Sequence, residues 1–455
     1  MTSTETSPDQ FSDQFFDPSI AEELSARYKI LKMIGKGGSG VVYLAYDQFE
    51  DRQVAIKVAQ LEDTENGGGR LHKLWMNEIR LSGQLKHPFI VNTYEAGLIK
   101  AGGYIVMEYL SGGTLKPFTQ PDKLLPVERV VEIIFKVCKA LEYVYSVGIL
   151  HRDIKPGNIL LDQNGDIKVS DFGACYQSSG EDTQVLGVGT FNYVPPEQFK
   201  NASPNVQFDI YATGLMAYQL LTGHLPFTGQ TSESLIYQKL YVDPPPLSEW
   251  RKDIPPRLSE VILRAIARDP AQRYGEWKAF SEDLEGALSA SGNKEIVSDS
   301  SKYASLSKLD FFSGFDQKEL WETIQISTRM LYKPGEPIVS EGEAGTSIYV
   351  IIVGEADVLK NGAKINQMKT GSCFGEIAYL DEVAKIRTAS VVATTMLVAL
   401  CIDGERLRQS SDGLQARFSS AFLRAMLNKI AQSDSRFIAM TEWMASSPFN
   451  PVSKP

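Results

Sequence analysis

Two carboxylates, an ammonium group and an amide lie close together in the middle of the 455-residue sequence. The run His151-Arg152-Asp153-Ile154-Lys155-Pro156-Gly157-Asn158 is followed, after a short predicted hairpin, by Asp171-Phe172-Gly173. Asp153 can accept the proton of an attacking hydroxyl group, while Asn158 and Asp171 can offer hard oxygen ligands to Mg²⁺. These residue types in this order suit phosphoryl transfer from a metal-bound nucleotide.

A glycine-rich loop precedes this stretch. The run Ile34-Gly35-Lys36-Gly37-Gly38-Ser39-Gly40-Val41-Val42 has the pattern Gly-x-Gly-x-x-Gly-x-Val, in which the glycines let backbone N–H groups approach nucleotide phosphates. A dinucleotide-binding fold also uses Gly-x-Gly-x-x-Gly, but there a helix follows the loop. Here the β-branched run Val41-Val42-Tyr43-Leu44-Ala45 follows, so we predict a hairpin of two strands.

The order of the motifs along the chain identifies the family that they resemble. Lys57 and Glu78 follow the glycine-rich loop, and the segment Gly189-Thr190…Pro196-Glu197 follows Asp171-Phe172-Gly173. Residues 28 to about 288 therefore resemble a eukaryotic-type protein kinase of the serine/threonine branch that is widespread in bacteria. The resemblance implies a two-lobed fold that uses ATP and Mg²⁺ to phosphorylate Ser or Thr in a protein substrate.

The resemblance also implies the catalytic roles. Lys57 is expected to bind the α- and β-phosphates of ATP and to form an ion pair with Glu78 of the predicted C-helix. Lys155, two residues after the catalytic Asp153, is expected to act with it and indicates Ser/Thr rather than Tyr substrates. Ser82 stands where many kinases have a large apolar residue, so this helix is expected to be weakly anchored.

The remaining nucleotide contacts follow from the same resemblance. Met107 is the expected gatekeeper, and the backbone groups of Glu108 and Leu110 are expected to bind adenine. Asn158 and Asp171 are the expected metal ligands. The residues expected to cover the phosphates or sandwich the adenine ring are Ile34, Gly35, Gly37, Gly40, Val42, Ala55 and Leu160.

The polar segment after Asp171 resembles an activation loop. Arg152 precedes the catalytic aspartate, and kinases with such an arginine often need a phosphate in this loop. Beyond the loop, Arg273 is expected to form a scaffold ion pair with Glu197. The candidate phosphate acceptors are Thr183, which is best placed, Ser178 and Ser179.

The texture of the sequence changes in its last third. Residues 289–304 are small and polar, as expected of a linker, and from Leu309 onward glycines punctuate short β-rich runs. Asn361-Gly362 lies between two such runs and predicts a type I′ hairpin. We therefore expect an antiparallel barrel or jelly roll.

Part of this predicted jelly roll resembles the phosphate-binding cassette of cyclic-nucleotide-binding domains. The matching runs are Phe374-Gly375-Glu376-Ile377-Ala378-Tyr379-Leu380 and Arg387-Thr388-Ala389-Ser390-Val391. Glu376 can accept a hydrogen bond from a ribose 2′-hydroxyl, and Arg387 can bind a cyclic phosphate with two hydrogen bonds. Thr388 beside the arginine is compatible with cyclic AMP and with cyclic GMP, so the resemblance implies one of these as a regulatory ligand.

Two features depart from the pattern of that family. Glu376 and Arg387 are farther apart than usual, and Ile386 replaces the proline that often precedes the arginine. One alternative is therefore a barrel in which Glu376 and Arg387 pair with each other, so that the domain binds no ligand and serves interaction or dimerisation. Another alternative is a chain that acts only as a non-catalytic scaffold.

An apolar stripe at helical spacing follows the barrel. It suits the domain core, the seam of a homodimer, or a helix that caps the nucleotide. The stripe consists of Phe418, Phe422, Met426 and Ile430, with Leu423 and Leu427 beside it.

The expected fold class is α+β, with a bilobal protein kinase fold followed by a β-jelly-roll cyclic-nucleotide-binding domain and flanking helices. The expected segments are a flexible tail at 1–27, the kinase domain at 28–288, the linker at 289–304, the cyclic-nucleotide-binding-like domain with its C-terminal helix at 305–432, and a tail at 433–455.

Composition limits the function classes. The net charge of −10 argues against a nucleic-acid-binding surface. The N-terminal residues lack the basic and apolar regions of a signal peptide, and no uncharged apolar run approaches the ~18 residues of a membrane span, so no membrane insertion is expected. The cysteines form no Cys-x-x-Cys pair, which indicates free thiols in a reducing, cytoplasmic compartment.

Overall fold

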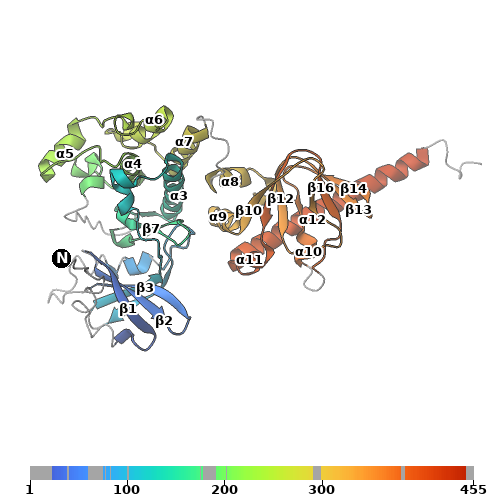
Figure 1. Ribbon diagram of the computed structural model, residues 1–455, viewed down its shortest axis with the longest axis horizontal. Coiled ribbons are helices and arrows are strands. Elements are labelled where there is room, and N and C mark those ends of the chain that lie inside the picture. The colour runs from blue at the N-terminus through green and yellow to red at the C-terminus, as the bar shows by residue number, and fades with distance from the viewer. Residues whose placement is uncertain are drawn as a thin grey trace, which may run out of the picture. The chain divides into compact units, whose positions relative to one another are not determined.

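A computed structural model describes residues 23–37, 40–59, 75–76, 78–81, 83–99, 102–174, 176–177, 191–200, 202–289, 299–380 and 385–446. The chain divides into two compact units, Met1–Ile296 and Val297–Pro455, and each is described by itself (Figure 1). The predicted phosphate acceptors Thr183, Ser178 and Ser179, together with Ser82, lie outside the described residues.

The first unit begins with an antiparallel sheet in the strand order β1-β2-β3-β5-β4. Apolar side chains of this sheet, among them Val54, Ile56 and Val106, are buried in one cluster. Gly37 of β1 pairs with Gly40 of β2, which confirms the hairpin predicted at the glycine-rich loop. The strands are β1 (Tyr28–Gly37), β2 (Gly40–Asp47), β3 (Arg52–Ala59), β4 (Thr93–Ile99) and β5 (Gly102–Glu108).

A mainly helical lobe follows this sheet in the first unit (Figure 1). Its central helix is α3 (Val127–Ser146), which buries Val130, Ile134 and Leu141 at helical spacing and packs against α4 and α7. The other helices are α4 (Val206–Thr222), α5 (Ser232–Tyr241), α6 (Pro256–Ala265) and α7 (Trp277–Ser289). Two short antiparallel pairs lie between α3 and α4, namely β6 (Ile149–Leu150) with β9 (Tyr176–Gln177) and β7 (Ile159–Leu161) with β8 (Ile167–Val169).

The second unit is a jelly roll of two four-stranded antiparallel sheets, ordered β10-β17-β12-β15 and β11-β16-β13-β14. Asn361 and Gly362, between β13 and β14, have φ angles of 51° and 78°, which confirms the predicted type I′ hairpin. The strands are β10 (Ser327–Tyr332), β11 (Pro337–Val339), β12 (Ile348–Val353), β13 (Ala356–Lys360), β14 (Ala363–Met368), β15 (Cys373–Phe374), β16 (Ser390–Ala393) and β17 (Leu397–Ile402).

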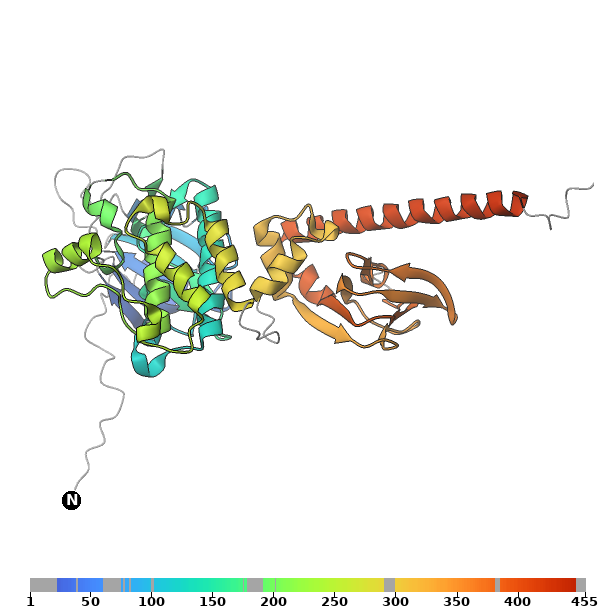
Figure 2. The same ribbon diagram turned by 90° about the horizontal axis from the view of Figure 1, so that it is seen from above.

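Helices flank this jelly roll, and the last of them runs past its strands (Figure 2). Phe418 and Phe422 of the predicted apolar stripe are buried, whereas Leu423 and Leu427 are exposed. Phe418 packs against the aromatic ring of Phe315, so this part of the stripe belongs to the core of the unit. The helices are α8 (Asp299–Leu306), α9 (Gln317–Gln325), α10 (Glu376–Leu380), α11 (Gly404–Arg408) and α12 (Asp412–Ser446). None of the described helices has both the length and the apolar character that a membrane span requires.

Two segments differ from the sequence-based expectation. α8 begins inside the stretch 289–304 that was expected to be a linker, because Tyr303 stacks on Trp321 of α9 and Leu306 is buried. α12 continues through Ser446, past the start of the tail expected at 433–455. These contacts of α8 could not be predicted from the polar sequence around it, because Tyr303 and Leu306 alone in a short helix give no periodic apolar signal.

Candidate functional site

Three charged side chains meet in the cleft of the first unit. Lys57 of β3 places its Nζ 2.6 Å from Oε1 of Glu78, which lies in a helical segment, and 2.9 Å from Oδ1 of Asp171. Burial would lower the pKa of Lys57, but the two carboxylates raise that pKa above its usual value. Lys57 therefore stays protonated, and the two residues of the expected ion pair are in contact.

The loop that follows β6 presents one oxygen of Asp153. Lys155 Nζ lies 2.6 Å from Asp153 Oδ2, and the amide of Asn158 donates to the same oxygen at 3.0 Å. The other oxygen, Oδ1, is buried and has no hydrogen-bond partner among the described residues. An oxygen in this state can accept the proton of an incoming hydroxyl group.

A buried carboxylate fixes the backbone of this loop. Asp209 of α4 accepts hydrogen bonds from the N–H groups of His151, at 2.8 Å, and Arg152, at 2.7 Å. Arg152 and Asp171 both have a φ angle of 65°, a left-handed conformation that non-glycine residues rarely adopt. Asp209 was not predicted as a site residue, because its partners are backbone groups far away in the sequence.

A cavity of about 500 Å³ lies beside Lys57, between the glycine-rich loop and the end of β5. The N–H of Glu108 donates to the carbonyl of Asn92, so this N–H is not available to a ligand. Asn158 and Asp171 also line the cavity, and their oxygens are ligands that suit Mg²⁺. The other expected nucleotide residues that line it are Ile34, Gly35, Gly37, Gly40, Val42, Ala55, Leu110 and Leu160.

Residues 192–197 are anchored by two cationic side chains. Arg273 donates to both oxygens of Glu197, at 2.6 and 2.8 Å, which places the two residues of the expected scaffold pair in contact. Lys239 of α5 donates to the carbonyl oxygens of Asn192 and Val194, both at 2.7 Å. Lys239 was not predicted as a site residue, because bonds to backbone carbonyls leave no pattern in the sequence.

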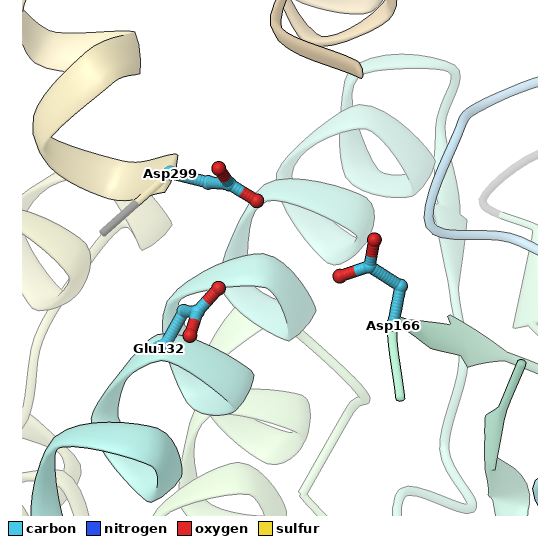
Figure 3. Close-up of side chains that lie close together, drawn as sticks. All are labelled: Glu132, Asp166 and Asp299. Carbon is cyan, nitrogen blue, oxygen red and sulfur yellow. The ribbon is translucent and has the colours of Figure 1, made fainter. Parts of the chain in front are cut away.

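An acidic pair lies in the same unit, where Glu132 of α3 and Asp166, just before β8, approach one another (Figure 3). Lys136 Nζ lies 3.0 Å from Glu132 Oε1 and 2.6 Å from Asp166 Oδ1. Arg129 binds the other oxygen of Glu132 at 2.8 Å. Because both carboxylates already have cationic partners, we interpret the pair as part of the packing of the lobe.

In the second unit, the two expected ligand-binding residues are buried but do not pair with each other. Glu376 Oε1 lies 2.6 Å from Lys429 Nζ of α12. Arg387 Nη1 instead donates to the carbonyl of Ser347 at 2.9 Å. The alternative in which Glu376 and Arg387 neutralise each other therefore differs from the structure.

Two glycines make room for the Arg387 guanidinium group. A Cβ atom at Gly345 would lie 3.1 Å from Nη2, and one at Gly375 would lie 2.7 Å from Nη1. Within the described part of the chain, Arg387 donates hydrogen bonds to the backbone carbonyls of Ser347 and Gly375. A buried cation without a carboxylate partner suits an anionic ligand. Thr388 is exposed beside it, and residues 381–384 are outside the described part of the chain.

A sheet joined to a helical lobe, with a lysine, two acidic residues and a glycine-rich hairpin in the cleft, is the fold and site of a protein kinase. A family model described as "Protein kinase domain" matches residues 28–284. The chain belongs to this family. A second model, described as "Cyclic nucleotide-binding domain", matches residues 329–411.

Bacterial serine/threonine-protein kinases are similar to the first unit. PrkC of Bacillus subtilis is 36% identical over 273 residues, which cover 60% of this chain and 42% of the relative. PknB of Mycolicibacterium smegmatis is 36% identical over 271 residues, with 58% and 43% covered. PknL of Mycobacterium tuberculosis is 34% identical over 271 residues, with 59% and 67% covered. The chain thus spans less than half the length of the first two relatives.

Proposed function

We propose that the protein is a serine/threonine kinase that transfers the γ-phosphoryl group of ATP to hydroxyl groups of protein substrates. The observation that carries this proposal is the cleft in which Lys57 contacts both Glu78 and Asp171. The unpartnered oxygen of Asp153 and the glycine-lined cavity support it. Similarity to bacterial serine/threonine-protein kinases supports it independently.

Each charged residue has a role in this proposal. Lys57 holds the α- and β-phosphates and is itself oriented by Glu78. Asn158 and Asp171 hold Mg²⁺, which when bound neutralises charge on the phosphates. Asp153 accepts the proton of the substrate hydroxyl through its Oδ1 atom, while Lys155 holds the other oxygen.

Substitution of the two central residues tests the kinase proposal. Asp153→Asn and Lys57→Met should each lower phosphorylation from labelled Mg·ATP by at least about 100-fold, because both residues act on the reacting groups. Asp122→Asn and Lys123→Met remove the same charges at exposed positions and should leave the rate unchanged. Thermal melting confirms that each variant is folded. Near-normal turnover in a folded Asp153→Asn protein would contradict the assignment.

We further propose that the second unit binds cyclic AMP or cyclic GMP and thereby regulates the kinase. The support is Arg387, a buried guanidinium group in a space lined by two glycines. Glu376 and Thr388 complete the proposed ligand contacts. The rival functions are an interaction or dimerisation module without ligand, for which the exposed Leu423 and Leu427 of α12 offer an apolar face, and a scaffold without catalysis.

Calorimetry with cyclic AMP and cyclic GMP separates these functions. A charge-assisted contact contributes about 1.5–3 kcal/mol, so Arg387→Ala should weaken binding by about 10- to 150-fold. Arg406→Ala removes an exposed arginine of the same unit and should leave the affinity unchanged. The absence of heat at millimolar ligand, in folded protein, would favour the ligand-free module. The absence of phosphorylation would favour the scaffold.

We also infer that the kinase autophosphorylates between residues 174 and 190, and that Arg152 binds the phosphate. Mass spectrometry of active protein should find phosphate on Thr183, Ser178 or Ser179. Equal activity of wild type, Thr183→Ala and a Ser178/Ser179 double alanine variant would contradict this switch.

We place the protein in the cytoplasm on the basis of its free thiols, among them the buried Cys138 and Cys373.

A further inference from the structure

The second unit contains an ion pair that the proposed nucleotide contacts do not use. Lys429 lies on α12, about two helical turns after the buried Phe422 and thus on the same face of the helix. Its Nζ atom lies 2.6 Å from Oε1 of Glu376 and donates to the carbonyl of Cys373 at 3.1 Å. The side chain of Glu376 is only 3% exposed, whereas that of Lys429 is 37% exposed. The chain therefore supplies a cation of its own to the buried carboxylate.

We propose that Lys429 is a specificity-determining residue of the nucleotide site, because its ammonium group forms an ion pair with the Glu376 carboxylate, which would otherwise bind a ribose 2′-hydroxyl. This inference rests on the proposed binding of a cyclic nucleotide to the second unit. A ligand that enters the site must either displace Lys429 from Glu376 or leave the carboxylate unused.

The cost of displacement follows from burial and charge. Glu376 needs a partner in every state, because a buried carboxylate without one is strongly unfavourable. A hydroxyl group is neutral, so it compensates the carboxylate less well than an ammonium ion at 2.6 Å does. The exposed part of the Lys429 side chain gives the ammonium a route to water once it leaves Glu376. Displacement is therefore feasible, but it reduces the net affinity.

This cost applies only to ligands that reach Glu376. Arg387 stands apart from the Lys429 ion pair, since its hydrogen bonds go to the carbonyls of Ser347 and Gly375. A phosphate can thus bind Arg387 whether or not Lys429 is displaced. As a result, the wild-type protein should discriminate weakly between a cyclic ribonucleotide and its 2′-deoxy analogue, which differ by one hydroxyl group.

Calorimetry on the full chain can measure this discrimination. The probes are cyclic AMP, cyclic GMP and their 2′-deoxy analogues, and the variant is Lys429→Met, which keeps an unbranched side chain without the charge. The variant should bind the cyclic ribonucleotide at least about tenfold tighter, and its affinity for the 2′-deoxy analogue should change less than about twofold. Arg424→Met removes an exposed cation from the same helix and should change neither affinity.

Two controls keep the test decisive. Thermal melting establishes folding, and Lys429→Gln provides a polar, uncharged alternative if the methionine variant is unstable. Melting of Lys429→Met, Glu376→Gln and the double variant measures the coupling of the pair without any ligand. Additive effects of the two substitutions would contradict the ion pair in solution.

The outcomes distinguish this inference from the function on which it rests. Two results with a folded Lys429→Met protein would overturn the role of Lys429 and leave the nucleotide site standing. In one, the variant binds the cyclic ribonucleotide no tighter than wild type does. In the other, its affinities for the ribonucleotide and for the 2′-deoxy analogue increase by the same factor. The absence of heat with all four nucleotides, in wild type and variant alike, would overturn the nucleotide site and the inference together.

Discussion

Lys239 illustrates how one buried side chain can hold a backbone segment of the kinase domain, here residues 192–194. Its side chain is buried in α5, and it donates to the carbonyls of Asn192 and Val194. Val194 also borders a small pocket that Asp153, the proposed proton acceptor, lines as well. Lys239 therefore connects α5 to the backbone that lies beside Asp153. Burial lowers the pKa of Lys239 to about 7.

The lowered pKa predicts how stability depends on pH. Unfolded lysine keeps its proton up to about pH 10.4, so between about pH 7 and 10.4 the unfolded chain binds more protons at residue 239 than the folded chain. The contribution to the unfolding free energy should therefore rise with pH in that window and be lost as the pH falls from about 10.4 to about 7. The stability difference between wild type and Lys239→Met should grow by up to about 1.4 kcal/mol per pH unit.

Thermal melting can be followed from pH 6.5 to 9 in wild type and in Lys239→Met. The transition that belongs to the kinase unit is the one that Mg·ATP shifts to a different temperature. Lys123→Met, at an exposed lysine, controls for the loss of a charge alone. Parallel pH curves for wild type and Lys239→Met would show that residue 239 does not titrate in this range.

The site residues that could be predicted from the sequence differ in kind from those that could not. Lys57 and Asp171 were predicted because their motifs have fixed order and spacing, and the structure brings them together. Asp209 and Lys239 escaped notice because each bonds to backbone groups, which exist at every residue. Lys429 offered a weak signal, a charge on the apolar face of a predicted helix, but its partner is determined only by tertiary packing.

At the scale of elements, local rules succeeded where a turn determines the backbone. The Asn361-Gly362 hairpin was predictable because both residues tolerate positive φ, and Lys360 and Ala363 on either side then pair across the turn. The position of α8 was not predictable, because the stacking of Tyr303 on Trp321, a contact distant in sequence, accompanies its formation. Helix ends without a cap or an apolar period carry little sequence information.

The turn between β15 and α10 offers a test of the ligand site at this scale. Gly375 has a φ angle of 88°, and an added Cβ would lie 2.6 Å from the carbonyl oxygen of Ser347 and 2.7 Å from Arg387 Nη1. Gly375→Ala should therefore displace the arginine, lower the melting temperature and weaken nucleotide binding by at least about tenfold.

Gly371→Ala is the matched control, because Gly371 has a similar φ angle of 84° but open space around the added Cβ. It should cost about 1–2 kcal/mol for the left-handed backbone and leave the nucleotide affinity unchanged. Equal effects of the two substitutions on binding would mean that the position of Arg387 does not depend on Gly375.

At the scale of the whole molecule, a kinase and a cyclic-nucleotide-binding domain share one chain, and regulation becomes a question of coupled equilibria. A ligand can shift the kinase between two states only by its differential affinity for them. A tenfold shift in the ratio of the states requires about 1.4 kcal/mol of that difference. Such coupling is reciprocal for binding. If the cyclic nucleotide changes the affinity for ATP by some factor, ATP must change the affinity for the cyclic nucleotide by the same factor.

This reciprocity can be measured directly on the full chain. Suppose that the second unit regulates nucleotide binding by the first. Cyclic AMP or cyclic GMP then changes the affinity for a non-hydrolysable Mg·ATP analogue by some factor. The analogue should change the affinity for the cyclic nucleotide by the same factor. Calorimetry in each order, on the full chain, measures both factors, which we expect to be about 5- to 150-fold. Arg387→Ala should lose the effect at sub-saturating cyclic nucleotide and keep the intrinsic affinity for the analogue, whereas Arg406→Ala should behave as wild type. A cyclic nucleotide that binds with measurable heat yet changes neither the analogue affinity nor the phosphorylation rate would show that the two domains act independently.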